Sequence, residues 1–412
     1  MTTYRASLLT PTAPDAVRYL PDALVEVDAG GTIRTVDEVH GVTARVDHDL
    51  RPGLLTPGFV DAHIHYPQTR VVGRASGPLL PWLQHTVFPE EARFSDPQHA
   101  ARVAATFCDR LSASGTTLAL VYGSAHPEAA DILFQTMDAR GLRAIAGPVL
   151  MDDDCPDALC HPREVALPAL EALAARWHDH DRGRLRVAVI PRFALSCSPE
   201  MLAEAGALAA RLGLPISTHL SENLDECALT CARFGAPDYL SVYERAGLCR
   251  PGAVFAHAIH LSDSEWQRLS ASQAVLAHCP DSNDFLGSGG MDIGRARALG
   301  VPVAIGTDIA AGRTFRIPRV LSSAYDNARR QGTELTPAEL FWLGTRGGAL
   351  ALSTPEVGAI EPGLEADMVL FDLPADTSGS DAVLDALIFD HDSGGVRSSW
   401  VRGGRVFGRG TA

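Results

Sequence analysis

Short apolar segments alternate with amphipathic segments along most of the chain. Eight of the short segments are rich in small and β-branched residues, a composition that favours strands. They lie near residues 57–63, 115–122, 143–150, 186–192, 214–220, 253–258, 273–278 and 301–307. Stretches with the apolar spacing of helices separate them, for example 98–113 and 199–212. Eight such alternations predict an α/β fold, a closed parallel (β/α)8 barrel of the TIM type.

Both ends of the chain depart from this pattern. Residues 18–56 contain short β-like pieces and turns, including Gly30-Gly31, a pair typical of a hairpin. Residues 362–372 and 399–407 have the same character. A length of 412 residues accommodates a barrel of about 250 residues and a second module. We therefore expect residues 1–56 and 362–412 to form a small β-sandwich module and 57–361 to form the barrel.

Composition narrows the classes of function. The formal net charge of −15 argues against a nucleic-acid partner, because such proteins usually carry a basic face. All 35 basic residues are arginine, which excludes a lysine Schiff base, a phosphate-loop lysine and a carboxylated lysine that bridges two metals. The eight cysteines form no paired C-x-x-C set. No signal peptide or membrane-spanning run is evident, so we expect a cytoplasmic protein with no membrane partner.

Four residues at predicted strand ends have side chains that bind metals. His63 and His65 in PGFVDAHIH share one face of a strand, so two imidazoles can meet one ion at about 2.1 Å each. His219 ends LPISTHL, and Asp308 ends VPVAIGTD, where a buried charge needs a partner. Mixed nitrogen and oxygen ligation suits zinc best, with iron or manganese left open. Taken singly, the histidines could be structural and Asp308 could cap the next helix.

Further polar and aromatic residues follow the same strand ends. Glu222 lies three positions after His219, and His257 ends the sixth strand, so both are candidates for the barrel mouth. Arg192 and Phe193 end the fourth strand. An arginine there could recognise a carbonyl oxygen, and a phenylalanine could stack on a flat ring. The alternative for the arginine is an ion pair with a neighbouring carboxylate.

The motifs together resemble a known family. The segments occur in the order PGFVDAHIHYPQ, FPEEARF, PRFALSCS, THLSENLDE, FAHAIHLS, AHCPDSN, LGSGG and GTDIAAG. This order resembles that of the guanine deaminases of the amidohydrolase superfamily, from about residue 53 to 350. The H-x-H and GTD pieces are shared across the superfamily, whereas PQ after H-x-H, FPxExRF and HxSENxDE are more specific.

The resemblance implies a hydrolytic deamination of guanine to xanthine and ammonia by a homodimer with one zinc ion per chain. Zinc lowers the pKa of a bound water toward 7. The implied zinc ligands are His63, His65, His219 and Asp308. The implied substrate-binding residues are Gln68, Arg192 and Phe193, and the implied catalytic residues are Glu222, His257 and Asp308.

Three positions depart from the pattern of that family. Asp284, Arg313 and Arg316 stand where apolar, small or neutral residues are usual. These three residues do not affect the predicted metal ligands, but they leave the identity of the substrate base undecided. One alternative is a zinc-dependent deaminase or hydrolase of another purine-like, pterin or triazine ring. The other is a non-catalytic amidohydrolase-like scaffold, against which the presence of every implied ligand argues.

Overall fold

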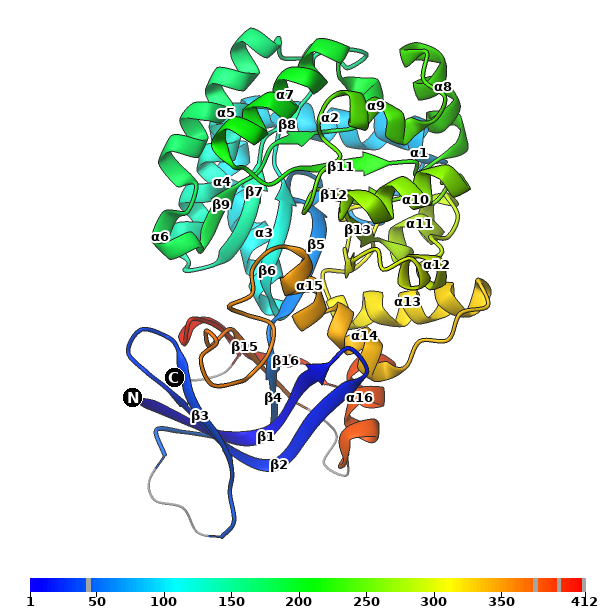
Figure 1. The fold of residues 1–412 in the computed structure, drawn as a ribbon. Coiled ribbons are helices and arrows are strands. Elements are labelled where there is room, and N and C mark those ends of the chain that lie inside the picture. Colours follow the sequence, from blue (N-terminus) through cyan, green and yellow to red (C-terminus); the bar gives the residue numbers. More distant parts are fainter. Residues whose placement is uncertain (42–45, 373–376, 391–393, 410–412) are drawn as a thin grey trace.

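A ring of parallel strands forms the centre of the molecule. The computed structural model describes residues 1–41, 46–372, 377–390 and 394–409. The ring strands are β5 (Phe59–His65), β6 (Thr116–Tyr122), β7 (Arg143–Gly147) with β8 (Val149–Leu150), β9 (Leu185–Val187) with β10 (Ile190–Pro191), β11 (Ser217–Leu220), β12 (Val254–His257), β13 (Val275–His278) and β14 (Val303–Ile305). They lie in the middle of the upper part of Figure 1.

Hydrogen bonds close this ring. The strands pair in the orders β5-β6-β7-β9 and β11-β12-β13-β14, and the short strands β8 and β10 pair with each other. A parallel bridge between Val189 and Ile216 joins the two halves at one seam. At the other seam the Asp308 N–H donates to the His63 carbonyl oxygen at 2.8 Å. The predicted (β/α)8 barrel is therefore confirmed, with the third predicted strand interrupted at Pro148, which has no N–H to donate.

Helices surround the barrel and carry the loops that reach its mouth. Helices α3 and α7 coincide with the predicted segments, since Asp96 and Ser198 cap their first turns and a proline follows each cap. The helices between β5 and β12 are η1 (Tyr66–Gln68), α1 (Leu79–Trp82), η2 (Leu83–Val87), α2 (Phe88–Glu91), η3 (Ala92–Ser95), α3 (Pro97–Ala113), α4 (Pro127–Ala139), α5 (Arg163–Trp177), α6 (His180–Gly183), η4 (Ala194–Ser196), α7 (Pro199–Leu212), α8 (Leu224–Phe234) and α9 (Tyr239–Arg245). Those that follow are α10 (Asp263–Ser272), α11 (Pro280–Leu286), α12 (Ile293–Ala298), α13 (Ile317–Arg330), α14 (Pro337–Leu343), α15 (Arg346–Ala351) and α16 (Ser380–Ile388).

The remaining strands come from both ends of the chain. They are β1 (Thr2–Ala13), β2 (Ala16–Val27), β3 (Ile33–Glu38), β4 (His48–Pro57), β15 (Met368–Phe371), β16 (Val396–Val401) and β17 (Gly404–Gly408). The predicted hairpin at Gly30-Gly31 is confirmed, because it joins the antiparallel pair β2 and β3. Gly31 has φ +84°, and a Cβ there would lie 2.3 Å from the Arg402 carbonyl oxygen.

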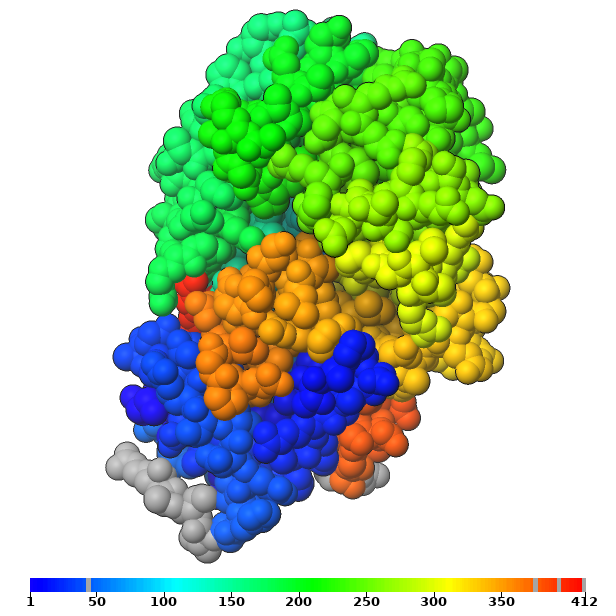
Figure 2. Space-filling model, viewed as in Figure 1, coloured from blue at the N-terminus to red at the C-terminus, as the bar shows by residue number. Residues whose placement is uncertain are grey.

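These terminal strands form one continuous sheet in the order β17-β16-β15-β4-β1-β2-β3. Tyr4 of β1, Ile33 of β3 and Trp400 of β16 belong to one buried cluster, so the sheet curls around a core of its own. In Figures 1 and 2 the blue and red terminal segments lie together beneath the barrel. The proposed division at residues 56/57 and 361/362 stays a prediction. Residues 42–45, 373–376, 391–393 and 410–412 of the predicted module lie outside the described residues.

A buried arginine links the barrel to this sheet. Arg143 begins β7 and is only 1% exposed. Its Nε donates to Asp367 Oδ2 at 2.9 Å, and its NH2 group contacts Glu365, just before β15. The guanidinium therefore ties a barrel strand to the segment that returns to the terminal sheet.

Replacing Arg143 by alanine is expected to lower the free energy of unfolding by roughly 3 kcal/mol, because it leaves Asp367 buried without its partner. Denaturant unfolding measures the change. Arg211, which pairs with Glu171 at an exposed site, is the matched control, and its alanine variant should change stability by less than ~1 kcal/mol. Equal losses in the two variants would contradict a role for the buried pair.

Candidate active site

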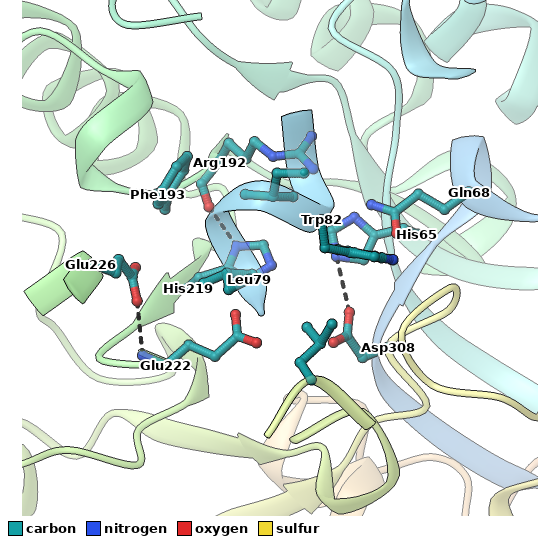
Figure 3. A pocket seen from close by; sticks show the side chains of 12 residues that line it. His65, Gln68, Leu79, Trp82, Arg192, Phe193, His219, Glu222, Glu226 and Asp308 are labelled. Carbon is teal, nitrogen blue, oxygen red and sulfur yellow. Dashed lines mark hydrogen bonds and ion pairs between the residues drawn. The ribbon is translucent and has the colours of Figure 1, made fainter. Parts of the chain in front are cut away.

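A cavity lies at the carboxyl ends of the barrel strands. The side chains around it come from the ends of β5 and β11 and from the segments that follow β5, β10, β11, β13 and β14, where barrel enzymes assemble their sites. The lining residues are His65, Gln68, Leu79, Trp82, Leu83, Arg192, Phe193, His219, Glu222, Glu226, Leu286 and Asp308. Figure 3 shows the Glu222 and Asp308 carboxylates extending into the same space.

Three of the predicted metal ligands meet directly. The Nε2 atoms of His63 and His65 lie 3.1 Å apart. Asp308 Oδ1 lies 3.3 Å from His63 Nε2 and 3.2 Å from His65 Nε2. The strand alternation that places both histidines on one face of β5 thus brings them to a carboxylate that follows β14, the neighbouring strand across the seam.

Two more imidazoles complete the cluster. His219 donates its Nδ1–H to the Arg192 carbonyl oxygen at 2.5 Å, which leaves Nε2 with a free lone pair. His257 Nδ1 lies 2.8 Å from Asn283 Oδ1, and its buried Nε2 has no hydrogen-bond partner among the described residues. Such hydrogen bonds fix the tautomer and aim the other nitrogen at a metal.

The most compact set of donors differs from the predicted ligand set. One donor atom from each of His63, His219, His257 and Asp308 lies within 4.8 Å of the others. This group contains His257 in place of His65, although His65 Nε2 contacts two of its members. Five donors therefore converge on one region, and the assignment of four ligands among them stays a prediction.

The local backbone aims two of these side chains. His257 and Asp308 have φ values of 72° and 49°, a left-handed conformation that such residues rarely adopt. Strain of this kind collects at functional sites, where the surrounding structure holds it in place. Below them, Asp61 accepts hydrogen bonds from the Thr307 N–H at 3.0 Å and the His63 N–H at 3.2 Å, which ties β5 to the end of β14.

Burial controls the ionisation of the cluster. It lowers the pKa of His63 to about 3 and lowers the pKa of His65 and His219, so these imidazoles are neutral. Burial alone would raise the pKa of Asp308, but hydrogen bonds from His63 and His65 hold it well below its ordinary value. Neutral imidazoles beside an ionised carboxylate are the donor set that a divalent metal requires, so the residues fit such an ion.

Glu222 occupies a different environment from Asp308. Burial, together with the nearby carboxylates of Asp308 and Glu226, raises the pKa of Glu222 well above its ordinary value. Its Oε2 lies 3.4 Å from His257 Nε2, and Ser288 donates to its Oε1 at 3.3 Å. The raised pKa favours the protonated carboxyl group that a general acid requires, and this group faces the cavity.

The predicted substrate-binding residues also line the cavity. Arg192 and Phe193 follow β10, and Gln68 ends the one-turn helix after β5. Arg192 does form an ion pair, with Glu91 at 2.5 Å, while its side chain still lines the cavity. Arg192 therefore both forms the ion pair with a carboxylate and lines the cavity.

Several of the lining residues are not among the residues predicted from the sequence. The apolar ones are Leu79, Trp82, Leu83 and Leu286, and the polar one is Glu226. Glu226 accepts hydrogen bonds from the Glu222 N–H at 3.0 Å and the Tyr239 hydroxyl at 2.7 Å. The sequence signal for Glu226 is its position in the SENLDE motif, four residues after Glu222.

The three departures from the family pattern make contacts elsewhere. Asp284 binds Arg330 at 2.7 Å, Arg313 binds Asp281 at 2.6 Å, and Arg316 donates to the Gly394 carbonyl oxygen at 2.7 Å. None of them is among the described residues that line the cavity.

The family is decided by comparison with known proteins. The model of the amidohydrolase family matches residues 54–406. The chain belongs to the amidohydrolase family. It is 40% identical to the guanine deaminase of Escherichia coli over 365 residues, 87% of this chain and 82% of that protein. It is 39% identical to a probable guanine deaminase of Deinococcus radiodurans, over 99% of both chains. The predicted resemblance is confirmed.

Solved structures agree with this assignment. The E. coli guanine deaminase superposes with a TM-score of 0.93, at 36% identity over all of both chains. A guanine deaminase of C. acetobutylicum with bound guanine gives 0.92, at 28% identity over 98% of this chain and all of that one. An adenosine deaminase of Xanthomonas campestris with bound zinc gives 0.86, at 26% identity over 98% of this chain and 92% of that one. No helix among the described residues is long and apolar enough to cross a membrane.

Proposed function

We propose that this amidohydrolase hydrolyses guanine to xanthine and ammonia with one zinc ion per chain. The observation that carries the proposal is that one cavity brings three kinds of group together. It contains members of the His/Asp cluster that could hold a metal, the Glu222 carboxyl group with its raised pKa, and the side chains of Gln68 and Arg192. The guanine deaminases that it resembles, one of them with guanine bound, support this choice of substrate.

His63, His65, His219 and Asp308 would hold the metal. When bound, zinc would act as a Lewis acid and make a water molecule nucleophilic near neutral pH. The zinc-bound adenosine deaminase of the same fold supports zinc as the ion. The lack of lysine supports one ion per chain, because a carboxylated lysine cannot bridge a second.

Gln68, Arg192 and Phe193 would hold the base. Arg192 and Gln68 offer N–H donors to a carbonyl oxygen at the purine edge away from the amino group. Phe193 presents an aromatic side chain to the flat ring. A base held in this way turns its amino-bearing carbon toward the donor cluster.

The acidic residues would move the protons. Asp308 would take a proton from the attacking water, and Glu222 would donate one to the ring nitrogen next to the amino-bearing carbon. That carbon becomes tetrahedral, and the amino group leaves as ammonia after protonation. His257, whose Nε2 lies 3.4 Å from Glu222 Oε2 and carries a free lone pair, would accept a hydrogen bond from the attacking water.

The direct test is ammonia release and the change in ultraviolet absorbance when guanine is added to metal-analysed protein. Stoichiometric xanthine and ammonia support the proposal. A protein that carries its metal but leaves guanine unchanged would overturn it.

Replacing Glu222 by glutamine should lower kcat by at least ~10², because the amide keeps the shape but cannot carry the proton. Metal content should not change, since Glu222 is not in the predicted ligand set. Steady-state kinetics and elemental analysis measure both quantities. Near-normal turnover would mean that another group delivers the proton.

We also propose that the protein works as a homodimer in the cytoplasm. The resemblance to guanine deaminases supports the dimer. The eight cysteines, all of them free, suit a reducing compartment. Light scattering on the purified protein gives the mass that tests the oligomeric state.

A further inference from the structure

A further buried carboxylate contacts the proposed substrate-binding residues. Glu91, in the FPEEARF segment, ends α2 and is 1% exposed. Its Oε1 accepts a hydrogen bond from Gln68 Nε2 at 3.0 Å, and its Oε2 accepts one from Arg192 NH1 at 2.5 Å. One carboxylate thus contacts both residues that the proposed function assigns to the purine edge.

These contacts define the orientation of the Gln68 amide. The Gln68 NH₂ group donates to Glu91, and the Gln68 Oε1 atom accepts a hydrogen bond from the Ala310 backbone N–H at 3.0 Å. A carboxylate only accepts and a backbone N–H only donates, so a flipped amide would lose both bonds. The second N–H of Gln68 therefore has a defined direction.

The same helix also holds the Arg192 guanidinium. Its central carbon lies 5.1 Å from the centre of the Phe88 ring, and its NH1 contacts Glu91, three residues further along α2. Both contacts come from one face of the segment. Glu91 also balances a buried positive charge close to the predicted metal site, where an unpaired guanidinium would be costly.

We propose that Glu91 is a positioning residue that makes the cavity selective for a purine with a carbonyl oxygen at position 6. It holds Gln68 and Arg192 so that both present N–H groups to that oxygen. A purine with an amino group at position 6 places N–H donors opposite the N–H donors of Gln68 and Arg192, so the donors on both sides stay unpaired. This inference rests on the proposed function and adds the residue that sets its selectivity.

The test is Glu91→Gln, which keeps the size but removes the charge and one acceptor. We expect kcat/KM for guanine to fall by about 10², mostly through a higher KM, because a buried charged pair is broken. The ratio of kcat/KM for guanine to that for 2,6-diaminopurine should fall by at least ~10-fold. The affinity for xanthine, measured by calorimetry, should weaken in parallel, with metal content unchanged.

Glu90 supplies the matched control. It is the preceding residue and is also buried, at 8% exposure, but it pairs with Arg93 at 2.9 Å and His99 at 3.2 Å. Glu90→Gln should therefore keep the wild-type selectivity and xanthine affinity. If Glu91→Gln does not fold, Glu91→Asp, which keeps the charge but is too short for both contacts, should show the same loss of selectivity.

A double-mutant cycle separates positioning from general destabilisation. Because Glu91 acts through Arg192 as well as Gln68, Glu91→Gln should cost less in an Arg192→Ala background than in the wild type. Additive losses, or wild-type selectivity in both Glu91 variants, would overturn the inference. A wild-type protein that binds xanthine but does not deaminate guanine would overturn the proposed function alone, whereas one that does neither would overturn both.

Discussion

Replacing Asp308 by alanine is expected to abolish both metal binding and deamination. Asp308 Oδ1 contacts His63 Nε2 and His65 Nε2 at 3.3 and 3.2 Å, so its removal takes the only carboxylate from the donor cluster. The loss of Lewis-acid activation costs several kcal/mol of transition-state stabilisation, so the rate should fall roughly 10³-fold or more. His63→Ala should behave in the same way.

Elemental analysis and an ammonia assay on the same preparation measure the two losses together. Asp284→Ala is the control, because Asp284 pairs with the exposed Arg330 and does not line the cavity. It should retain about one metal per chain and full activity. An Asp308→Ala protein that keeps its metal would remove Asp308 from the ligand set, and two stoichiometric ions in the wild type would contradict a mononuclear site.

The barrel could be predicted because its signals are local. Each strand is a short apolar run, and Asp96-Pro97 and Ser198-Pro199 mark where two helices begin. Parallel strands end at one face, so residues at those ends could be expected to meet without any knowledge of distances. His63, His65, His219 and Asp308 meet for this reason.

What escaped prediction depends on pairing between distant segments. Whether the terminal strands make two sheets or one continuous sheet depends on β4, which pairs with β1 on one side and β15 on the other. Trp82 and Leu83 line the cavity from short irregular helices with no periodic pattern. Glu91 contacts residues 23 and 101 positions away, which no spacing rule connects.

The choice among bases depends on the Gln68–Arg192 pair, and guanine should exceed adenine as a substrate by ~10⁴ or more. Arg192 can only donate, and Gln68 presents an N–H because Ala310 and Glu91 define its amide orientation. Guanine offers a carbonyl oxygen to these donors, whereas adenine offers an amino group there. A buried site built to bond one edge rejects the wrong edge by about 10⁴–10⁵.

Arg192→Ala should accordingly lower kcat/KM for guanine by about 10² or more while metal content stays near one ion per chain. Arg313→Ala is the matched control, because Arg313 also pairs with a carboxylate, Asp281 at 2.6 Å, but does not line the cavity. The kinetics of Arg313→Ala should match those of the wild type. The same measurement tests whether Arg313, which departs from the family pattern, affects the choice of base. If Arg192→Ala were harmless, or if adenine were the better substrate, guanine would have to be abandoned as the substrate. The metal-dependent hydrolase would survive that result, since neither Gln68 nor Arg192 is among the predicted metal ligands.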